Sequence, residues 1–288
     1  MTQIIQGQAF IPSFNSHVPG AGFPNPDPDS SGQSNPQTDN LADSIAFVQP
    51  AIPPEGCPDY TPQTYLISQD PRMIYIESFL TEEERLHLVS QSEPNYTPAY
   101  VVSDNDDTAT TDETVRKSET AGLDRDTVVR CIEHRARTLQ PHWENKALEP
   151  LSVQRYTAGG FFTYHLDALQ VSPTSVSPLP NRKSTFNVWL DGNCTGGGTH
   201  FPAIPRAKND DPVLCGWINC TVAKGNGTIF RPIAGNAVFW EGIRDDEQSL
   251  YQETVHAGLA VERGTKIGLN IWTWVFDSKD PRGGGGGS

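Results

Sequence analysis

The chain has 288 residues, 36% of them hydrophobic, and its 35 acidic against 21 basic side chains give a formal net charge of −14. This length suits one or two domains, and the hydrophobic share is sufficient for a buried core. The acidity argues against nucleic acid or an anionic membrane surface as partner, because both are bound by clustered lysine and arginine. No stretch of the sequence approaches the roughly 20 consecutive apolar residues of a membrane-spanning helix.

Residues 1–62 have the composition of an unstructured arm. They hold 11 of the 24 prolines and many Ser, Gln, Asn and Asp residues, so they can bury too little apolar surface to offset the entropy of ordering. We expect this arm to be disordered or draped over a folded domain, with 45–48 docking locally. No Lys or Arg precedes Arg72, which excludes a secretory signal and a mitochondrial transit peptide. This indicates a cytoplasmic protein, or one of the endoplasmic reticulum lumen whose targeting segment has been removed.

The cysteines give a weak signal about compartment. There are five of them and no Cys-x-x-Cys pair, so a structural zinc site is disfavoured. Cys215 and Cys220 could form a disulfide, or could equally be buried free thiols. Chance accounts for a few Asn-x-Ser/Thr sequons in such a sequence, so the four that occur do not establish secretion: Asn95, Asn193, Asn219 and Asn226.

The folded domain is expected over residues 63–278 and begins with a strand near Met73. Thr81 and Glu84 have the spacing of a capping box, which predicts a helix over 82–92. Asp126 can cap a second helix, predicted over 126–139, where apolar residues recur at helical spacing until Pro141 ends it.

From Leu151 onward, short β-type runs alternate with Gly and Pro. About eight strands are predicted, one of them in "VLCGWIN" (213–219), which is typical of a barrel or jelly roll. The expected fold class is therefore an all-β core with supporting N-terminal helices, α+β overall. The order of elements is not βαβ, which disfavours a Rossmann domain. Residues 279–288 end in a Gly-rich run typical of a flexible, engineered linker.

The chemistry centres on His165 and Asp167. Residues two apart on a strand point to the same face, so this imidazole and carboxylate would lie side by side. His256 in a later strand adds a second imidazole. Two imidazoles and one carboxylate are the ligand set of non-heme Fe(II) oxygenases, whereas zinc prefers a closed tetrahedron or three ligands plus water.

Lys266 is the second informative residue, because it lies in an otherwise apolar strand. Burying an ammonium group is costly without a partner, and a substrate or cosubstrate carboxylate would be that partner. A solvent-facing strand lysine is the alternative.

With these residues in place, the sequence from about Arg72 to Phe276 resembles the Fe(II)/2-oxoglutarate dioxygenases of the prolyl 4-hydroxylase type. The Tyr-x-x-Gly element and the His-x-Asp pair that follows it match Tyr156, Gly159, His165 and Asp167. Five further family motifs are matched: 115–118 (VRKS), Arg182 to Thr185, Gly197 to Pro202, Pro232 to Trp240 and His256 to Lys266. In the Gly197 to Pro202 motif, the Gly-Gly pair lies one residue closer to the Thr than it does in the family.

The resemblance implies a double-stranded β-helix, or jelly roll, with iron held by His165, Asp167 and His256. It implies that 2-oxoglutarate chelates the iron and that its far carboxylate pairs with Lys266, assisted by the hydroxyls of Tyr156 and Thr199. With O2 as the oxidant and ascorbate as the reductant, the enzyme would hydroxylate a C–H bond and release succinate and CO2.

The expected substrate follows from positions at which this sequence differs from the peptidyl-prolyl enzymes of the family. Phe162 and Trp274 stand where peptidyl-prolyl enzymes carry Tyr and His, while Arg182 matches a residue used for substrate contact. Phe162, Trp272 and Trp274 are candidate walls of an apolar pocket, or simple core residues. The loop 168–182 would be a lid or a passive connection. The expected substrate is proline or a proline-like cyclic amino acid, free or peptidyl, and the departures favour a small molecule.

Two other functions stay open at the level of sequence. One is a tailoring dioxygenase of secondary metabolism that acts on a larger apolar product, and the candidate aromatic pocket walls Phe162, Trp272 and Trp274 support it. The other is a β-sandwich binding protein that has lost catalysis. The sequence carries no signal for the oligomeric state.

Overall fold

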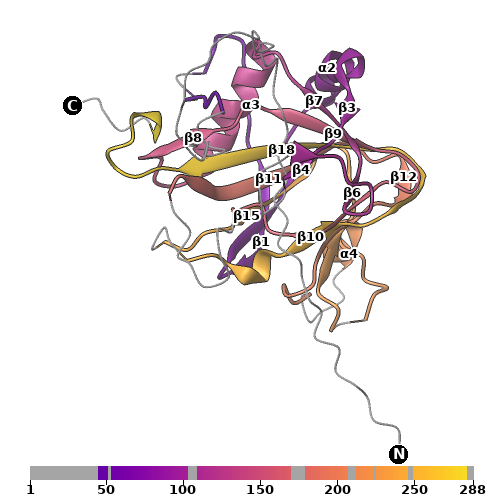
Figure 1. Cartoon of the computed structure of the whole chain (residues 1–288). Helices are drawn as coiled ribbons and strands as arrows, with labels where there is room; N and C mark the ends of the chain where they lie inside the picture. The colour runs from indigo at the N-terminus through magenta and orange to yellow at the C-terminus, as the bar shows by residue number, and fades with distance from the viewer. Residues whose placement is uncertain are drawn as a thin grey trace, which may run out of the picture.

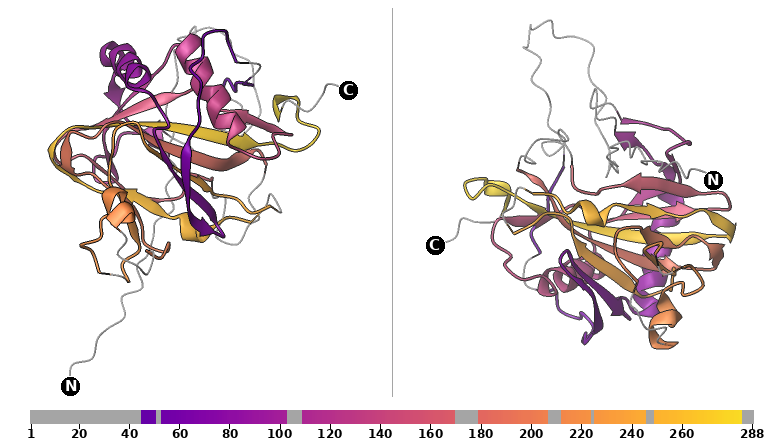
Figure 2. Two further views of the ribbon diagram at one scale, coloured as in Figure 1. Left: turned by 180° about the vertical axis from the view of Figure 1, so that it is seen from behind. Right: turned by 90° about the horizontal axis from the view of Figure 1, so that it is seen from below.

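The computed structural model describes residues 45–50, 53–102, 109–169, 179–206, 212–223, 225–245 and 249–283. Two antiparallel β-sheets form the centre, and α2 (Glu82–Ser92) and α3 (Thr127–Thr138) lie beside the larger sheet (Figure 1). Seen from behind, the helices again lie above the sheets (Figure 2, left). The predicted jelly-roll core with N-terminal helices is confirmed.

In the described residues, nine strands form the larger sheet. They are β1 (Gln63–Gln69), β2 (Arg72–Glu77), β3 (Thr97–Pro98), β7 (Glu119–Gly122), β8 (Lys146–Leu148), β9 (Ser152–Tyr156), β11 (Asn181–Asp191), β15 (Ala237–Glu241) and β18 (Lys266–Val275). Their order is β1-β2-β15-β11-β18-β9-β7-β3, and β8 pairs with β18. The long strands β11 and β18 lie next to each other at the centre and run through the whole molecule.

The smaller sheet lies on the other side of the larger one from the helices. Its strands are β6 (Arg116–Lys117), β10 (Phe161–His165), β13 (Thr199–Phe201), β14 (Thr228–Phe230) and β16 (His256–Gly258), in the order β14-β13-β16-β10-β6. Two strand pairs complete the described β-structure: β4 (Val101–Val102) with β5 (Ala109–Thr110), and β12 (Cys194–Gly196) with β17 (Val261–Gly264). Short helical turns are η1 (Glu93–Asn95), η2 (Gln252–Thr254) and η3 (Pro281–Gly283).

Strand alternation separates two environments on the larger sheet. In β11, Phe186, Val188 and Leu190 join the hydrophobic core beneath the helices, and Ile267, Leu269 and Ile271 of β18 do the same. The residues between them therefore point to the opposite face, toward the smaller sheet. That inner face carries Asn187 of β11 and Lys266 and Asn270 of β18.

The two predicted helices are confirmed at their N-termini. The Thr81 hydroxyl accepts from the Glu84 amide and the Glu84 carboxylate accepts from the Thr81 amide, which is a complete capping box. Asp126 caps α3 by accepting from the Val129 amide at 3.0 Å. Among the described helices, none combines the length and apolar character needed to span a membrane.

The sequence "VLCGWIN" is helical in part, and the predicted strand there is wrong. It forms α4 (Pro212–Trp217). Proline lacks the amide N–H that a strand ladder uses and is favoured in the first turn of a helix. The Cys215–Cys220 disulfide follows, and Trp217 stacks on Tyr75 with ring centroids 4.5 Å apart, which anchors the helix.

The described part of the N-terminal arm is fixed to the domain. Val48 and Leu148 exchange two backbone hydrogen bonds of 2.9 and 3.0 Å, and Phe47 packs its ring against Trp274. A disulfide joins Cys57 to Cys131 of α3. The rest of the predicted arm, residues 1–44 and 51–52, lies outside the described residues.

Only the first part of the C-terminal segment, residues 279–283, is described by the structure. The buried Gly283 ends η3, and its amide donates to the Asp280 carbonyl. Residues 284–288 of the predicted linker lie outside the described part of the chain.

A buried ion pair joins the two helices. Arg135 of α3 makes a two-pronged contact with Glu84 of α2 at 2.7 and 2.8 Å, and it also donates to the Phe79 carbonyl. The Arg135 and Glu84 side chains are only 4% and 6% exposed. Removing one partner of such a pair leaves an uncompensated buried charge, which is more costly than losing the attraction itself.

We expect Glu84→Ala to lower the free energy of unfolding by about 3–5 kcal/mol, because it strands the Arg135 guanidinium and removes half of the capping box. Arg130→Ala is the matched control: Arg130 is exposed on the same helix as Arg135, so the expected change is within about 0.5 kcal/mol. Urea unfolding followed by circular dichroism measures both. Equal stabilities of the two variants would show that the buried pair does not hold the helices.

Candidate active site

His165 and His256 lie opposite each other on neighbouring strands of the smaller sheet. His165 ends β10, His256 begins β16, and the two residues are direct antiparallel partners. Their ring centroids are 4.3 Å apart. Cross-strand pairing therefore fixes the separation of two imidazoles that are far apart in the sequence.

Backbone carbonyls orient both imidazoles. His165 Nδ1 donates to the Thr163 carbonyl at 2.8 Å, and His256 Nδ1 donates to the Thr254 carbonyl at 3.0 Å. These bonds place the hydrogen on Nδ1 and leave each Nε2 with its lone pair for a metal.

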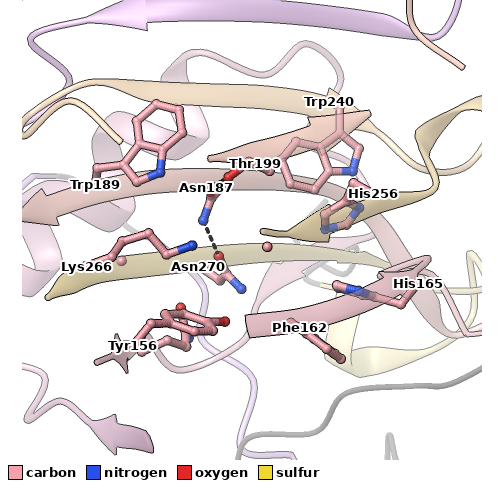
Figure 3. Close-up of a pocket in the computed structure, with 13 residues that line it drawn as sticks. Tyr156, Phe162, His165, Asn187, Trp189, Thr199, Trp240, His256, Lys266 and Asn270 are labelled. Carbon is pink, nitrogen blue, oxygen red and sulfur yellow. Dashed lines mark hydrogen bonds between the residues drawn. The ribbon is translucent and has the colours of Figure 1, made fainter. Parts of the chain in front are cut away.

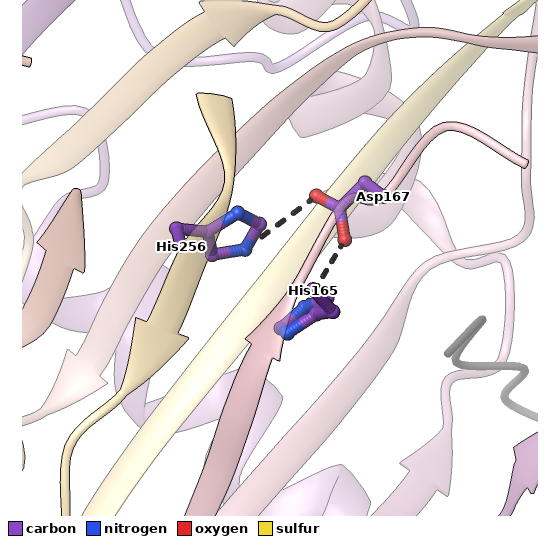
Figure 4. A group of neighbouring side chains, drawn as sticks. All are labelled: His165, Asp167 and His256. Atoms are coloured by element: carbon purple, nitrogen blue, oxygen red, sulfur yellow. Dashed lines mark ion pairs between the residues drawn. The ribbon is translucent and has the colours of Figure 1, made fainter. Parts of the chain in front are cut away.

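Asp167 follows β10 and completes the group (Figure 4). Its carboxylate lies 3.6 Å from His165 Nε2 and 4.0 Å from His256 Nε2. One carboxylate oxygen, Oδ2, accepts from the Thr185 hydroxyl at 2.7 Å, while the buried Oδ1 has no hydrogen-bond partner. The unpaired Oδ1 lies near the His165 nitrogen, and Oδ2 lies near the His256 nitrogen, which is an arrangement that a bound cation would satisfy.

The surroundings keep His256 and Asp167 in the protonation states that bind metal. Burial lowers the pKa of His256 to about 4, and the nearby His165 acts in the same direction. For Asp167, burial favours the neutral acid, but His256, His165 and Arg182 outweigh it, so the pKa of this carboxyl lies well below its usual value. Neutral imidazoles and an ionised carboxylate are the metal-ligating forms.

The three residues therefore fit Fe(II). Their ligand atoms all lie within 4.8 Å of one another, and all three side chains are buried. Two nitrogens and one oxygen supplied from one side leave further positions for exogenous ligands.

A pocket between the two sheets leads from the two histidines to Lys266 (Figure 3). The Lys266 side chain is buried, which rules out the solvent-facing alternative. Its Nζ donates to the Gly197 carbonyl at 3.0 Å and lies 4.3 Å from the centroid of the Tyr156 ring. Gly197 has φ of 67°, a conformation that glycine adopts without a Cβ penalty. Gly197 thus lets its backbone carbonyl approach the ammonium.

Lys266 has no carboxylate within ion-pair distance in the part of the chain that the structure describes. Burial lowers its pKa to about 8. A buried ammonium with one carbonyl partner is suited to receive an anionic ligand group.

Tyr156 and Thr199 also line this pocket, so all three residues expected to bind 2-oxoglutarate are brought together. The Thr199 hydroxyl donates to Asn187 Oδ1 at 3.1 Å, and Asn187 Nδ2 donates to Asn270 Oδ1 at 2.9 Å. The floor of the pocket is therefore a chain of polar side chains.

The residues expected to contact substrate divide into two groups. Phe162 lines the pocket and stacks on His165 with ring centroids 3.7 Å apart. A register shift between Phe162 and His165 accounts for both facing the same side. Arg182, Trp272 and Trp274 do not line this pocket; they form a separate cluster behind Asp167.

That cluster is built on a buried ion pair. Arg182 Nε donates to Glu149 at 2.6 Å, and the Arg182 guanidinium lies 4.1 Å from the Trp272 ring and 5.7 Å from the Trp274 ring. The Trp274 indole N–H also donates to Glu149. Arg182 reaches the backbone carbonyl of Asp167 at 3.3 Å, so the cluster borders the metal group. Most of the expected lid, residues 170–178, lies outside the described residues.

Sequence reasoning missed several pocket residues. Asn187 and Trp189 follow Thr185 at two-residue steps along β11, and Gly268 and Asn270 follow Lys266 in the same way. Strand alternation counted from the matched residues could have found them. Gln154, Trp240 and Gly258 complete this set.

The sequence and the fold were compared with known proteins. No family model matches the sequence. Prolyl 4-hydroxylase 5 of Arabidopsis thaliana is 30% identical over 218 residues, which cover 74% of this chain and 72% of that protein. Probable prolyl 4-hydroxylase 8 of the same plant is 30% identical over 216 residues, covering 74% and 71%.

The fold is similar to that of viral collagen prolyl hydroxylase from Paramecium Bursaria Chlorella virus-1, solved as its 2OG complex. The TM-score is 0.51 at 22% sequence identity, and the match covers 70% of this chain and 96% of that one. The plant relatives, the matching fold and the buried His-Asp-His group agree with the resemblance seen in the sequence. The chain belongs to the prolyl 4-hydroxylase family and is a 2-oxoglutarate-dependent non-heme iron dioxygenase.

Proposed function

We propose that this enzyme hydroxylates the ring of proline residues within peptides, with release of succinate and CO2. The observation that carries the proposal is the division of the site into two sides. The pocket with Lys266 lies on one side of the metal group, and the aromatic cluster with Arg182 borders it at Asp167. The names of the plant relatives support proline as the target.

The residues on the pocket side hold the cosubstrate. His165, Asp167 and His256 would bind Fe(II), and Lys266 would receive the far carboxylate of 2-oxoglutarate, with Tyr156 beside it. When bound, the iron supplies the oxidising chemistry by which O2 and 2-oxoglutarate place a hydroxyl on the substrate. The protein orients the reactants and excludes water through the aromatic rings that pack on the imidazoles, Phe162, Phe201 and Trp240. We expect ascorbate to serve as reductant.

The aromatic cluster supports a substrate with a small apolar ring. Trp272 is paired in register with Thr185, whose hydroxyl contacts Asp167, so both side chains lie on the same face near the metal group. The buried Trp272 indole N–H has no hydrogen-bond partner. A carbonyl group of a peptide substrate would satisfy it. Trp274, held by Glu149 and covered by Phe47, supports Trp272 from behind.

A peptide suits this surface better than a free amino acid, although the sequence favoured a small molecule. A free amino acid brings an ammonium and a carboxylate that both need partners. The charged residues of the cluster, Arg182 and Glu149, are paired with each other. A proline within a peptide carries neither of these charges, because its backbone nitrogen and carbonyl belong to amide bonds.

We also propose an oxidising compartment, such as the endoplasmic reticulum lumen, in place of the cytoplasm. Two disulfides occur among the five cysteines, all of which lie in the described residues. Disulfides persist in secretory compartments and are reduced in the cytosol. Cys194 is the remaining thiol.

The function is tested by succinate release from 2-oxoglutarate in air with Fe(II) and ascorbate. We expect short proline-containing peptides to stimulate succinate release and to gain one oxygen atom by mass spectrometry, while free proline and pipecolate do not. Asp167→Ala should abolish turnover, because two imidazoles alone leave the iron site incomplete. Oxygenation of free proline in preference to peptides would contradict the peptide proposal, and full activity of Asp167→Ala would contradict the iron site.

The affinity for 2-oxoglutarate should fall as pH rises through about 8, the lowered pKa of Lys266. The protonated ammonium binds the far carboxylate, so each pH unit well above 8 should weaken binding up to about tenfold. Calorimetry without O2, with Mn(II) replacing Fe(II), measures this. The control ligand 2-oxopentanoate lacks the far carboxylate and should not share the trend. Identical pH profiles for the two ligands would show that Lys266 does not set the affinity.

The compartment proposal is tested by counting thiols in protein isolated from its own cells. Alkylation before reduction should modify one cysteine, Cys194, and alkylation after reduction should modify all five. Cys194→Ser is the control and should show no modification before reduction. Five reactive thiols in the unreduced protein would place it in a reducing compartment.

A further inference from the structure

Trp189 is a buried hydrogen-bond donor without a partner inside the pocket. Its side chain is 1% exposed, it lines the pocket with Lys266, and its indole Nε1 makes no hydrogen bond to any residue that the structure describes. The residue lies on the inner face of β11, two positions beyond Asn187 and four beyond Thr185. Buried polar groups are nearly always paired in native proteins, so an unpaired N–H in a ligand pocket points to an acceptor that the ligand supplies.

The position within the pocket identifies which ligand group this is. Figure 3 shows Trp189 and Lys266 together at one end, with His165 and His256 at the other. A ligand that chelates the metal through its keto and adjacent carboxylate groups therefore extends its far carboxylate toward Trp189 and Lys266. A carboxylate accepts hydrogen bonds and donates none, so this end must supply donors.

Of the two hydroxyl donors expected at this end, those of Tyr156 and Thr199, the Thr199 hydroxyl is engaged elsewhere. The Thr199 hydroxyl donates its hydrogen to Asn187, whose own N–H group donates to Asn270. The indole of Trp189 has no such engagement. We propose that the Trp189 indole N–H, together with the Lys266 ammonium, binds the far carboxylate of 2-oxoglutarate, taking the place that the resemblance assigned to Thr199.

This inference rests on the proposed use of 2-oxoglutarate, and it makes β11 part of cosubstrate recognition. Charge-assisted hydrogen bonds from a fixed donor are directional, whereas the lysine ammonium is a rotatable point charge. Trp189 would thus set the direction of the carboxylate and Lys266 would neutralise it. Ligands without a carboxylate at this distance would leave both groups unsatisfied.

The test compares 2-oxoglutarate with 2-oxopentanoate, which keeps the chelating end and has a methyl group in place of the far carboxylate. Trp189→Phe keeps an aromatic ring and removes the N–H. By calorimetry with Mn(II) and without O2, we expect this variant to bind 2-oxoglutarate about tenfold more weakly, the size of one hydrogen bond to a charged group. Binding of 2-oxopentanoate should change by less than about twofold, because it makes no such bond.

Trp217→Phe is the matched control. Trp217 belongs to the same hydrophobic cluster as Trp189 but does not line the pocket, so its removal should leave both affinities unchanged. If Trp189→Phe weakens both ligands equally, Trp189 acts through packing and the proposal is overturned. Unchanged 2-oxoglutarate affinity overturns it as well. A wild-type protein that binds neither ligand in the presence of metal would instead overturn the proposed function itself.

The wild-type protein gives an independent measurement that does not depend on folding of the variant. In a Zn(II)-loaded sample, each of the six tryptophans can give an indole N–H signal by nuclear magnetic resonance. We expect one of these signals to shift downfield with 2-oxoglutarate and to stay in place with 2-oxopentanoate. If no indole signal distinguishes the two ligands, the proposal is overturned.

Discussion

The burial of charge between the two sheets is the constraint on which the site depends. A charge removed from water must be paired or it destabilises the fold. Asp167 faces two imidazoles and receives the Thr185 hydroxyl, and Arg182 is paired with Glu149. Among these charged groups, Lys266 alone has only a backbone carbonyl as its hydrogen-bond partner within the described residues. The structure therefore holds a full set of metal ligands at one end of the pocket and an unneutralised cation at the other.

The sheets meet this constraint because strand alternation keeps the two kinds of surface apart. β11 and β18 each direct a run of apolar side chains toward the helices, and pocket residues such as Asn187 and Lys266 toward the inner face, so a continuous core lies directly behind the site. The helices in turn are joined by their own buried pair, Glu84 with Arg135. A packed core with two joined helices behind the sheet holds the catalytic groups in place more accurately than loops would.

The register between β10 and β16 brings the two metal-binding histidines together. His165 and His256 are opposite each other because β10 and β16 pair antiparallel, and a shift of one residue would turn one imidazole away from the other. The carbonyls that fix their Nδ1 atoms belong to the chain two residues before each histidine. Backbone geometry thus sets both the separation and the tautomer of the ligands, with no further side chain required.

Local sequence patterns were sufficient to predict the two helices and the residues of the metal site. The capping residues Thr81, Glu84 and Asp126 predicted both helices, because a helix N-terminus is decided by side chains within one turn. The His-x-Asp pair, His256 and Lys266 together pointed to the chemistry, because two imidazoles with one carboxylate are the ligand set of non-heme Fe(II) oxygenases and a buried lysine needs an anionic partner. The strand predicted at "VLCGWIN" failed because the apolar run there is too short to distinguish strand from helix.

Other features depend on contacts between distant segments, which no local pattern contains. The pairing of Cys57 with Cys131, of Arg182 with Glu149, and the unpaired indole of Trp189 became visible only in three dimensions. The sequence by itself determined which groups can bind iron and an anion. Tertiary structure decided which polar groups are already satisfied by a neighbour and which still need a ligand, because that depends on the positions of partners far away in the chain.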